Sequence, residues 1–232
     1  MGKNKLAKFA DMNKFSNVIQ PSFEDAFHDK FKYKGNWWGY FGNTNPIVVE
    51  LGCGKGEYTV ALAEKNPSRN YIGIDIKGAR IWRGAKSALE KELQNVAFVR
   101  TRIDFIQSIF GDEEVDEIWI TFPDPQLKKS RNKKRLTSSR FLNAYKTLLK
   151  KDGIVHLKTD NQILHAYTAD LLKNNNCTIL ACTRDLYHSE FVNETHEIRT
   201  FYENLFLGQG LPITYLKFKL NHGEEIEEIP GD

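Results

Sequence analysis

The stretch Glu50–Thr59, ELGCGKGEYT, follows the apolar run Ile47–Leu51 and comes just before a helical pattern. Its glycines, Gly52, Gly54 and Gly56, allow the backbone to turn tightly and to approach a ligand closely. A strand that turns through such a loop into a helix is typical of nucleotide-binding α/β folds. The stretch therefore predicts an α/β domain with a ligand at the carboxyl end of its first strand.

Short β-rich runs alternate with helical patterns along the rest of the chain, which predicts βαβ units. Beyond the first run, the predicted strands are Tyr71–Asp75, Val96–Val99, Glu117–Phe122, Gly153–Thr159, Thr178–Cys182 and Tyr215–Leu220. The predicted helices are Glu57–Glu64, Lys77–Leu93, Thr137–Lys151 and Gln162–Lys173, with Thr137 as an N-cap and Gly153 as a stop. We expect an α/β, doubly wound, mostly parallel seven-stranded sheet of the Rossmann-like type.

Composition divides the chain into three parts. Residues 1–40 are basic and aromatic, and we expect an extension that packs on the domain. Residues 41–220 form the predicted domain, and residues 221–232 form an acidic tail that we expect to be loosely attached.

Bulk properties narrow the function classes only a little. The chain has 232 residues, 41% of them hydrophobic, which is enough for one real core. A net charge of +3 is too small to indicate nucleic-acid binding by itself. The three cysteines lack CxxC or Cys/His clustering, so we expect no metal site, no disulfides and a reduced, cytoplasmic setting. No apolar run is long enough to span a bilayer, so we expect no membrane insertion.

The glycine loop departs from two well-known nucleotide-binding patterns. The dinucleotide fingerprint GxGxxG requires glycine where this chain has Glu57. The P-loop requires Ser or Thr after Gly-Lys, where this chain has Gly56. The loop is therefore unlike both a dinucleotide-binding loop and a P-loop.

Three acidic residues follow three successive predicted strands. Glu50 suits a cationic ligand such as an ammonium or sulfonium group, Asp75 can accept the two ribose hydroxyls, and Asp104 can meet an adenine edge. This arrangement resembles motif I and its companions in class I S-adenosylmethionine-dependent methyltransferases. The alternative is that the glycines only form a tight turn and that Asp75 caps a helix.

The fourth predicted strand ends in TFPDP, Thr121–Pro125, where this class of enzyme places residues that face the methyl acceptor. Asp124-Pro125 lacks the second proline and the aromatic residue of enzymes that methylate exocyclic amines. Cys53 lies in the cofactor loop, and Cys177 and Cys182 lie near a late strand, so a cysteine nucleophile for pyrimidine C5 is disfavoured. A ring nitrogen such as guanine N7 can attack a methyl group without a general base, and a fixed carboxylate, Asp124 or Asp160, would stabilise the charge that develops.

A basic run directly follows this carboxylate. Alone, such a run is more often a solvated surface, but its position beside the ligand edge of the sheet favours RNA binding. The residues predicted to bind RNA are Lys129, Arg131, Lys133, Lys134 and Arg135, with Lys128 nearest the acceptor.

Several separate motifs together resemble the bacterial tRNA (guanine-N7)-methyltransferases. The family's E-I-G-C-G-K-G corresponds to Glu50–Gly56, and its I-G-I-E-I corresponds to Ile72–Ile76 with Asp75 for Glu. Its D-P-W-P-K-K-R-H corresponds without a gap to Asp124–Arg131, where Gln126 and Leu127 replace Trp and Pro. Its K-T-D and T-x-[YF]-E also recur, at Lys158–Asp160 and Thr200–Glu203.

The resemblance implies residue roles. It implies that Glu50, Asp75, Asp104 and Asp124 contact S-adenosylmethionine, with Asp124 also catalytic, and that the substrate nucleoside is contacted by Lys128, Asp160, Thr200, Phe201, Tyr202 and Glu203. Without it, Asp160 could cap the next helix and Glu203 could be an ordinary surface residue. Trp37, Trp38 and Trp119 are predicted to be packing residues.

The sequence thus predicts an enzyme that methylates N7 of a guanine in the tRNA variable loop by direct displacement. The alternatives are a methyltransferase of the same fold for another RNA or a small basic molecule, and a non-catalytic RNA-binding protein. Whether the chain is a monomer or a homodimer stays open.

Overall fold

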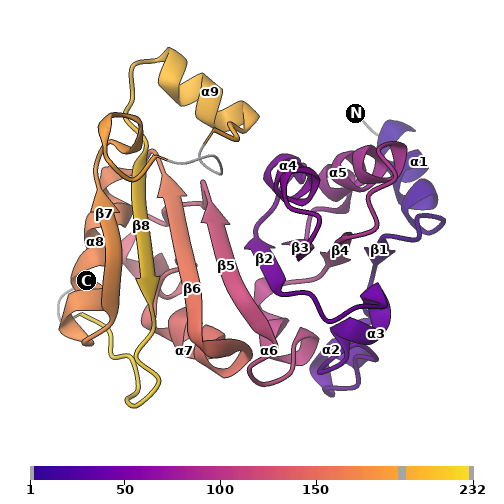
Figure 1. The fold of residues 1–232 in the computed structure, drawn as a ribbon, viewed down its shortest axis with the longest axis horizontal. Coiled ribbons are helices and arrows are strands. Elements are labelled where there is room, and N and C mark those ends of the chain that lie inside the picture. Colours follow the sequence, from indigo (N-terminus) through magenta and orange to yellow (C-terminus); the bar gives the residue numbers. More distant parts are fainter. Residues whose placement is uncertain (1–2, 193–196, 230–232) are drawn as a thin grey trace. The chain divides into compact units, whose positions relative to one another are not determined.

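The computed structural model describes residues 3–192 and 197–229. The chain divides into two compact units, residues 1–111 (unit 1) and residues 112–232 (unit 2), each with its own strands and helices (Figure 1). The two units are described in turn.

Unit 1 contains a parallel sheet with the strand order β1-β4-β3-β2. Its strands are β1 (Val18–Ile19), β2 (Ile47–Leu51), β3 (Asn70–Asp75) and β4 (Val96–Arg100). Every residue of β2 and β3 is buried, as expected for strands of a parallel sheet with both faces covered. Each fully buried Val or Ile side chain stabilises the fold by ~1.5–3 kcal/mol.

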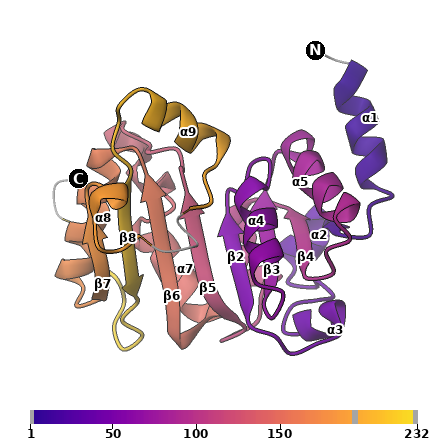
Figure 2. The ribbon, with the colours of Figure 1, turned by 45° about the horizontal axis from the view of Figure 1, so that its top comes forward.

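Helices connect and cover these strands. They are α1 (Lys3–Met12), α2 (Phe23–Phe27), α3 (Trp37–Phe41), α4 (Glu57–Lys65), α5 (Gly78–Glu90), η1 (Ile103–Phe105, a 3₁₀ turn) and α6 (Ile106–Ile109). Figure 2 shows α4 and α5 side by side over the strands, with α1 against α5. The contact between α1 and α5 includes a hydrogen bond of 3.1 Å from Trp82 Nε1 to Asp11.

Unit 2 contains the strand order β5-β6-β8-β7. Its strands are β5 (Val115–Thr121), β6 (Leu149–Thr159), β7 (Thr178–Thr183) and β8 (Thr214–Lys219). The strands β5 and β6 pair in parallel, whereas β8 is antiparallel to both β6 and β7. The α/β, mostly parallel fold is therefore confirmed, but the described residues contain eight strands rather than seven. The additional strand is β1, which has only two residues and so offers little pattern to read.

The helical segments of unit 2 are η2 (Lys129–Lys134, a 3₁₀ helix), α7 (Ser139–Leu148), α8 (Gln162–Asn174), η3 (Leu186–His188) and α9 (Phe201–Gly208). The expected N-cap Thr137 is wrong, because Ser138 occupies that position and the Thr137 hydroxyl lies 2.7 Å from the Thr168 hydroxyl. The expected stop at Gly153 is also wrong, because β6 begins at Leu149, directly after α7.

The tryptophan predictions are mostly confirmed. Trp37 and Trp119 are buried, and Trp37 Nε1 donates to Ile109 O at 3.1 Å. Trp38 is 60% exposed, so its assignment as a packing residue is wrong. On the short helix α3, neighbouring side chains point in different directions, and only one of the two tryptophans can face the core.

Among the described residues, no helix is both long and apolar enough to cross a membrane. Cys53, Cys177 and Cys182 are free thiols in this structure.

Candidate active site

The glycine loop of unit 1 connects β2 to α4 through backbone conformations that favour glycine. Gly52, Gly54 and Gly56 have φ values of 74°, 56° and 68°. A Cβ at Gly56 would meet the Phe98 ring at 2.5 Å, so this glycine allows close packing on β4. A Cβ at Gly54 would face open space, with Gly52 O the nearest atom at 3.9 Å. Gly54 is thus where a ligand can approach the backbone.

Glu50 fixes the geometry at the end of β2. Its side chain is buried, and its Oε2 accepts hydrogen bonds from Thr59 N, at 2.9 Å, and from the Thr59 hydroxyl. Gly56 occupies the N-cap position of α4 and has no side chain to cap the helix. Glu50 therefore satisfies an N–H in the first turn, where a negative charge is also favoured by the helix dipole.

Asp75 joins the glycine loop to the start of α5. Its Oδ2 accepts from Gly54 N at 3.0 Å, and its Oδ1 accepts from Lys77 N at 2.7 Å. Lys77 is the N-cap residue of α5, so Asp75 does shape the helix start, as the alternative interpretation held. An ionised carboxylate has about four acceptor positions, so these two bonds are compatible with further bonds to ribose hydroxyls.

The Cys53 thiol is buried and interacts electrostatically with both carboxylates, Glu50 and Asp75. Burial raises its pKa well above the ordinary value, and the charges of Glu50 and Asp75 raise it further. The thiol therefore stays protonated and is a poor nucleophile, in line with the argument from sequence against a cysteine mechanism.

Asp104 lies in η1, just after β4, and its carboxylate forms an ion pair of 3.2 Å with Arg102. The strands β2, β3 and β4 are adjacent and parallel, so Glu50, Asp75 and Asp104 follow the carboxyl ends of three neighbouring strands. In doubly wound folds ligands bind at this edge. The acidic set and the open space at Gly54 fit a ligand that carries a positive charge, ribose hydroxyls and an adenine amine, as S-adenosylmethionine does.

Unit 2 carries the predicted acceptor residues, beginning with the segment 122–135, here called the acceptor loop. Phe122 and Gln126 both have φ of 48°, an uncommon conformation for residues other than glycine. Phe122 N donates to Lys158 O at 2.8 Å, which continues the pairing of β5 with β6. Asp124 is exposed, and its Oδ1 accepts from Gln126 N at 3.0 Å. That it contacts the cofactor stays a prediction.

The basic run forms η2, and five of its cationic side chains are exposed: Lys128, Lys129, Arg131, Lys133 and Lys134. Arg135 differs, because it is only 4% exposed and its guanidinium lies over the Tyr167 ring, 4.1 Å from the centroid. A buried guanidinium cannot reach a phosphate, so Arg135 is a packing residue in this structure.

Asp160 follows β6. Burial raises its pKa, because a charged carboxylate loses hydration there. The N-cap of α8 is its neighbour Asn161, whose side chain accepts from Leu164 N at 2.8 Å. The alternative that Asp160 caps this helix is therefore wrong.

The other predicted substrate residues lie at α9, beyond the carboxyl ends of β5 and β6 (Figure 1). Thr200 and Glu203 form a capping box at its start. Glu203 is fully buried and pairs with Lys158 Nζ at 2.8 Å, while Tyr187 OH donates to the same oxygen at 2.5 Å. Glu203 is thus not the surface residue that the alternative interpretation held.

The first two residues of α9, Phe201 and Tyr202, face outward. Phe201 is 56% exposed and Tyr202 is 46% exposed.

The sequence analysis did not identify two partners of Glu203, which are Lys158 and Tyr187. Lys158 had a signal, because it stands in the K-T-D motif inside an otherwise apolar strand, whereas nothing in the sequence marks Tyr187.

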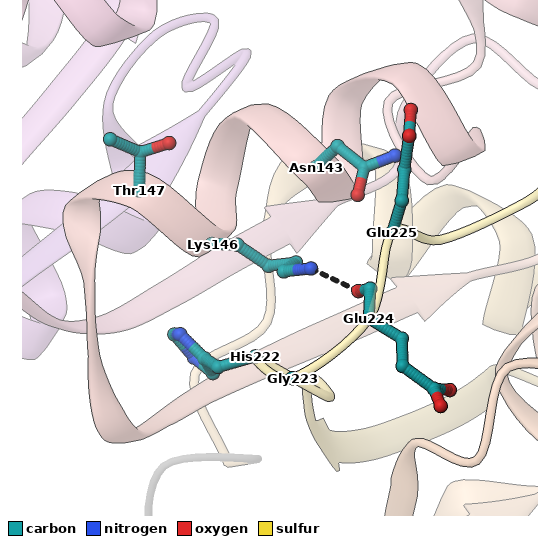
Figure 3. Close-up of a pocket in the computed structure, with 7 residues that line it drawn as sticks. All are labelled: Asn143, Lys146, Thr147, His222, Gly223, Glu224 and Glu225. Atoms are coloured by element: carbon teal, nitrogen blue, oxygen red, sulfur yellow. Dashed lines mark hydrogen bonds between the residues drawn. The ribbon is translucent and has the colours of Figure 1, made fainter.

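A separate cavity of about 510 Å³ lies against α7 in unit 2. Figure 3 shows its lining residues, from α7 and from the segment after β8, with Lys146 Nζ directed at the Glu224 carbonyl. None of the lining residues is a predicted site residue. In the described ranges, no cluster of His, Cys, Asp and Glu could hold a metal ion.

Comparison with known proteins identifies the family. Residues 44–216 match a protein-family model described as "Putative methyltransferase". The tRNA (guanine-N(7)-)-methyltransferase of Christiangramia forsetii is 56% identical over 220 residues, which cover 94% of this chain and 98% of that protein. The protein of the same name from Bacteroides thetaiotaomicron is 46% identical over 98% of this chain and 90% of its own length.

Solved structures agree on the fold. The 16S rRNA methyltransferase KamB superposes with a TM-score of 0.58 at 14% identity, covering 76% of this chain and 88% of that one. A 30S ribosomal A1408 methyltransferase from an uncultured bacterium gives a TM-score of 0.55 at 16% identity, covering 81% and 98%. With the methyltransferase family model matching most of the chain, and with relatives this similar along nearly their whole length, the chain belongs to the tRNA (guanine-N(7)-)-methyltransferase family.

Proposed function

We propose that this protein transfers a methyl group from S-adenosylmethionine to N7 of a guanine in the variable loop of tRNA. The observation that carries the proposal is the set of carboxylates Glu50, Asp75 and Asp104 at the ends of three neighbouring parallel strands around the glycine loop. Relatives that are 46–56% identical over 94–98% of this chain are named tRNA (guanine-N(7)-)-methyltransferases.

In this proposal, unit 1 holds the methyl donor. S-adenosylmethionine supplies a methyl group on a positively charged sulfur. The carboxylate of Asp75 binds the ribose hydroxyls, Asp104 accepts from the adenine amine, and the buried negative charge of Glu50 favours the cationic end of the ligand. Gly52, Gly54 and Gly56 allow the backbone to come close.

Unit 2 holds the acceptor. Guanine N7 has a lone pair and no proton to lose, so the side chains need only to orient the base and to stabilise positive charge on it. We assign charge stabilisation to Asp124 and nucleoside contacts to Lys128, Asp160, Phe201 and Tyr202. Glu203 and Thr200, which are buried, support α9 beneath the exposed pair.

The exposed cations Lys129, Arg131, Lys133 and Lys134 bind tRNA phosphates in this account. Arg135 is omitted because it is buried. The three free thiols accord with a cytoplasmic location, where tRNA is also found.

The test is incubation with unmodified tRNA and methyl-labelled S-adenosylmethionine. We expect label in tRNA, and we expect Asp75→Ala to weaken cofactor binding in a direct titration. A protein that binds tRNA but has no measurable affinity for S-adenosylmethionine would instead be a non-catalytic RNA-binding protein, and the proposal would fail.

A further inference from the structure

The described part of the acidic tail, residues 221–229, is bound to α7 and α8 rather than loosely attached. Asn143 Nδ2 donates to Ile226 O at 2.8 Å, and Asn143 Oδ1 accepts from Ile226 N at 2.9 Å. Asn175 pairs with Glu227 in the same way, at 3.0 and 2.7 Å. Ile226 is 2% exposed. Two side-chain amides therefore hold successive tail residues by their backbone.

Glu228 extends from this fixed backbone to the start of α7. Its Oε2 accepts from the Ser139 hydroxyl at 3.0 Å and from Ser139 N at 3.4 Å. Ser138, at the N-cap position, makes no capping bond with its own side chain. Glu228 thus satisfies an N–H in the first turn of α7, where negative charge is favourable.

The other carboxylate oxygen of Glu228, Oε1, begins a series of contacts that ends at the acceptor loop. Tyr167 OH donates to Glu228 Oε1 at 2.7 Å. Burial raises the pKa of Tyr167 far above its ordinary value and the bond to Glu228 raises it further, so the hydroxyl stays protonated and keeps donating. The Tyr167 ring in turn lies under the guanidinium of Arg135, at 4.1 Å.

Arg135 connects these contacts to the part of the acceptor loop that contains Asp124. Its Nε donates to Pro125 O at 3.3 Å, and Pro125 directly follows Asp124. Arg135, the last residue of the basic run, is therefore hydrogen-bonded to Pro125, which lies just before the run. A buried cation requires compensating negative charge, and through Tyr167 the Arg135 site is linked to the carboxylate of Glu228.

We propose that Glu228 is a positioning residue for methylation: through Tyr167 and Arg135 it holds the acceptor loop in the one conformation that presents Asp124 and the exposed lysines to tRNA. The inference rests on the proposed function. The loop needs such support because Phe122 and Gln126 adopt a conformation that is unfavourable for residues with side chains.

The test compares Glu228→Ala and Tyr167→Phe with the wild-type full chain. We expect each variant to lower kcat/KM for tRNA at least tenfold at a temperature well below its Tm, while the affinity for S-adenosylmethionine in a direct titration changes little. We also expect faster tryptic cleavage within Lys128–Arg135, because the loop loses its support. The matched control is Glu227→Ala, since Glu227 is an exposed neighbour that bonds Asn175 through its backbone, and it should behave as the wild type.

Two comparisons separate positioning from general stabilisation. If Glu228 acts through Tyr167, the double variant should lose no more activity than the more impaired single variant. Glu228→Gln, which can still accept from Tyr167, should recover part of the lost activity.

Unchanged kcat/KM in both Glu228→Ala and Tyr167→Phe, or a loss fully explained by a lower Tm, would overturn the inference. If Glu228→Ala does not fold, the Tyr167→Phe result decides, because only a hydroxyl is removed there. Absence of tRNA methylation by the wild type would instead refute the proposed function.

Discussion

The side chain of Asp124 shapes its own loop as well as serving the proposed reaction, because its Oδ1 accepts from Gln126 N at 3.0 Å. Substitution by alanine would remove both the charge and this bond. Substitution by asparagine keeps an oxygen that can accept from Gln126 N and removes only the charge. The pair of variants therefore separates electrostatics from loop geometry.

We predict that Asp124→Asn lowers kcat by about 10²-fold or more, as loss of one fixed charge-stabilising group does in other enzymes. Affinity for tRNA should stay largely intact, because the exposed lysines remain. Labelled methyl transfer and filter binding measure the two quantities. Asp112→Asn, at an exposed aspartate of the same unit, is the control. Near-normal turnover by Asp124→Asn would remove Asp124 from the catalytic role.

The buried pair of Lys158 and Glu203 allows a prediction about stability. Both side chains are fully buried and their charged atoms lie 2.8 Å apart. Glu203→Ala would remove the carboxylate that lies 2.8 Å from the buried Lys158 ammonium, so we expect a loss of roughly 3–5 kcal/mol in the free energy of unfolding. Urea denaturation measures it, with the exposed Phe201→Ala as a control that should lose little.

The double variant Lys158→Met/Glu203→Leu removes both charges at once. It should regain most of the stability lost by Glu203→Ala, because neither charge of the pair stays buried. A Glu203→Ala protein as stable as the wild type would show that the pair does not hold α9 in place.

The raised pKa of Asp160 predicts how stability changes with pH. Below its unfolded-state pKa of 3.8 the group is protonated in both states. As the pH rises through the higher folded-state pKa, the unfolded state ionises more readily, and the stability that the raised pKa gives at low pH is lost. Asp160→Asn should therefore be more stable than the wild type at pH 7, with a difference that shrinks toward pH 4.

Denaturant titrations at several pH values measure this difference. Asp152→Asn should give the opposite sign, because the hydrogen bond from Lys219 lowers the pKa of Asp152. Equal gains for Asp160→Asn at pH 7 and pH 4 would contradict the effect of burial on Asp160.

At the scale of elements, η2 gathers exposed cations on a short 3₁₀ helix. We predict that Lys133→Gln/Lys134→Gln lowers tRNA affinity. The slope of log affinity against log salt concentration should become less steep by about 0.7 to 0.9 for each lost phosphate contact. Binding measured across a series of salt concentrations gives the slope. Lys151→Gln/Lys173→Gln, at two exposed lysines elsewhere in unit 2, should leave the slope unchanged.

A slope that is the same in the η2 variant as in the wild type would make the basic run a solvated surface. Arg135 is left out of this test because its burial gives it a different task. From sequence alone, Arg135 was indistinguishable from its neighbours. Its burial depends on Tyr167, which lies 32 residues later in the chain and which no local pattern connects to it.

Elements with strong periodicity were predicted well, and those without it were not. The buried strands β2 and β3 and the helix α8 were read to within a residue or two. β1 is two residues long and was missed. The start of α7 was placed too early, because its first turn is satisfied by Glu228 from the tail rather than by a local cap.

At the scale of the whole molecule, the sequence indicated the fold class and the cofactor edge because both depend on local signals, a glycine loop and carboxylates at strand ends. The long-range partners of those residues could not be predicted from the sequence. Three hydrogen bonds depend on tertiary packing: the bond of Thr59 to Glu50, that of Tyr187 to Glu203 and that of Tyr167 to Glu228.

The central claim concerns the atom that receives the methyl group. The most direct measurement treats unmodified tRNA with the protein and S-adenosylmethionine, digests it to nucleosides, and maps the modified position by strand cleavage at 7-methylguanosine. The account predicts 7-methylguanosine at one guanine of the variable loop, formed about 10²-fold more slowly or slower still when Asp124→Asn replaces the wild type. A methyl group on any other atom or base, or an equal initial rate from Asp124→Asn, would contradict it.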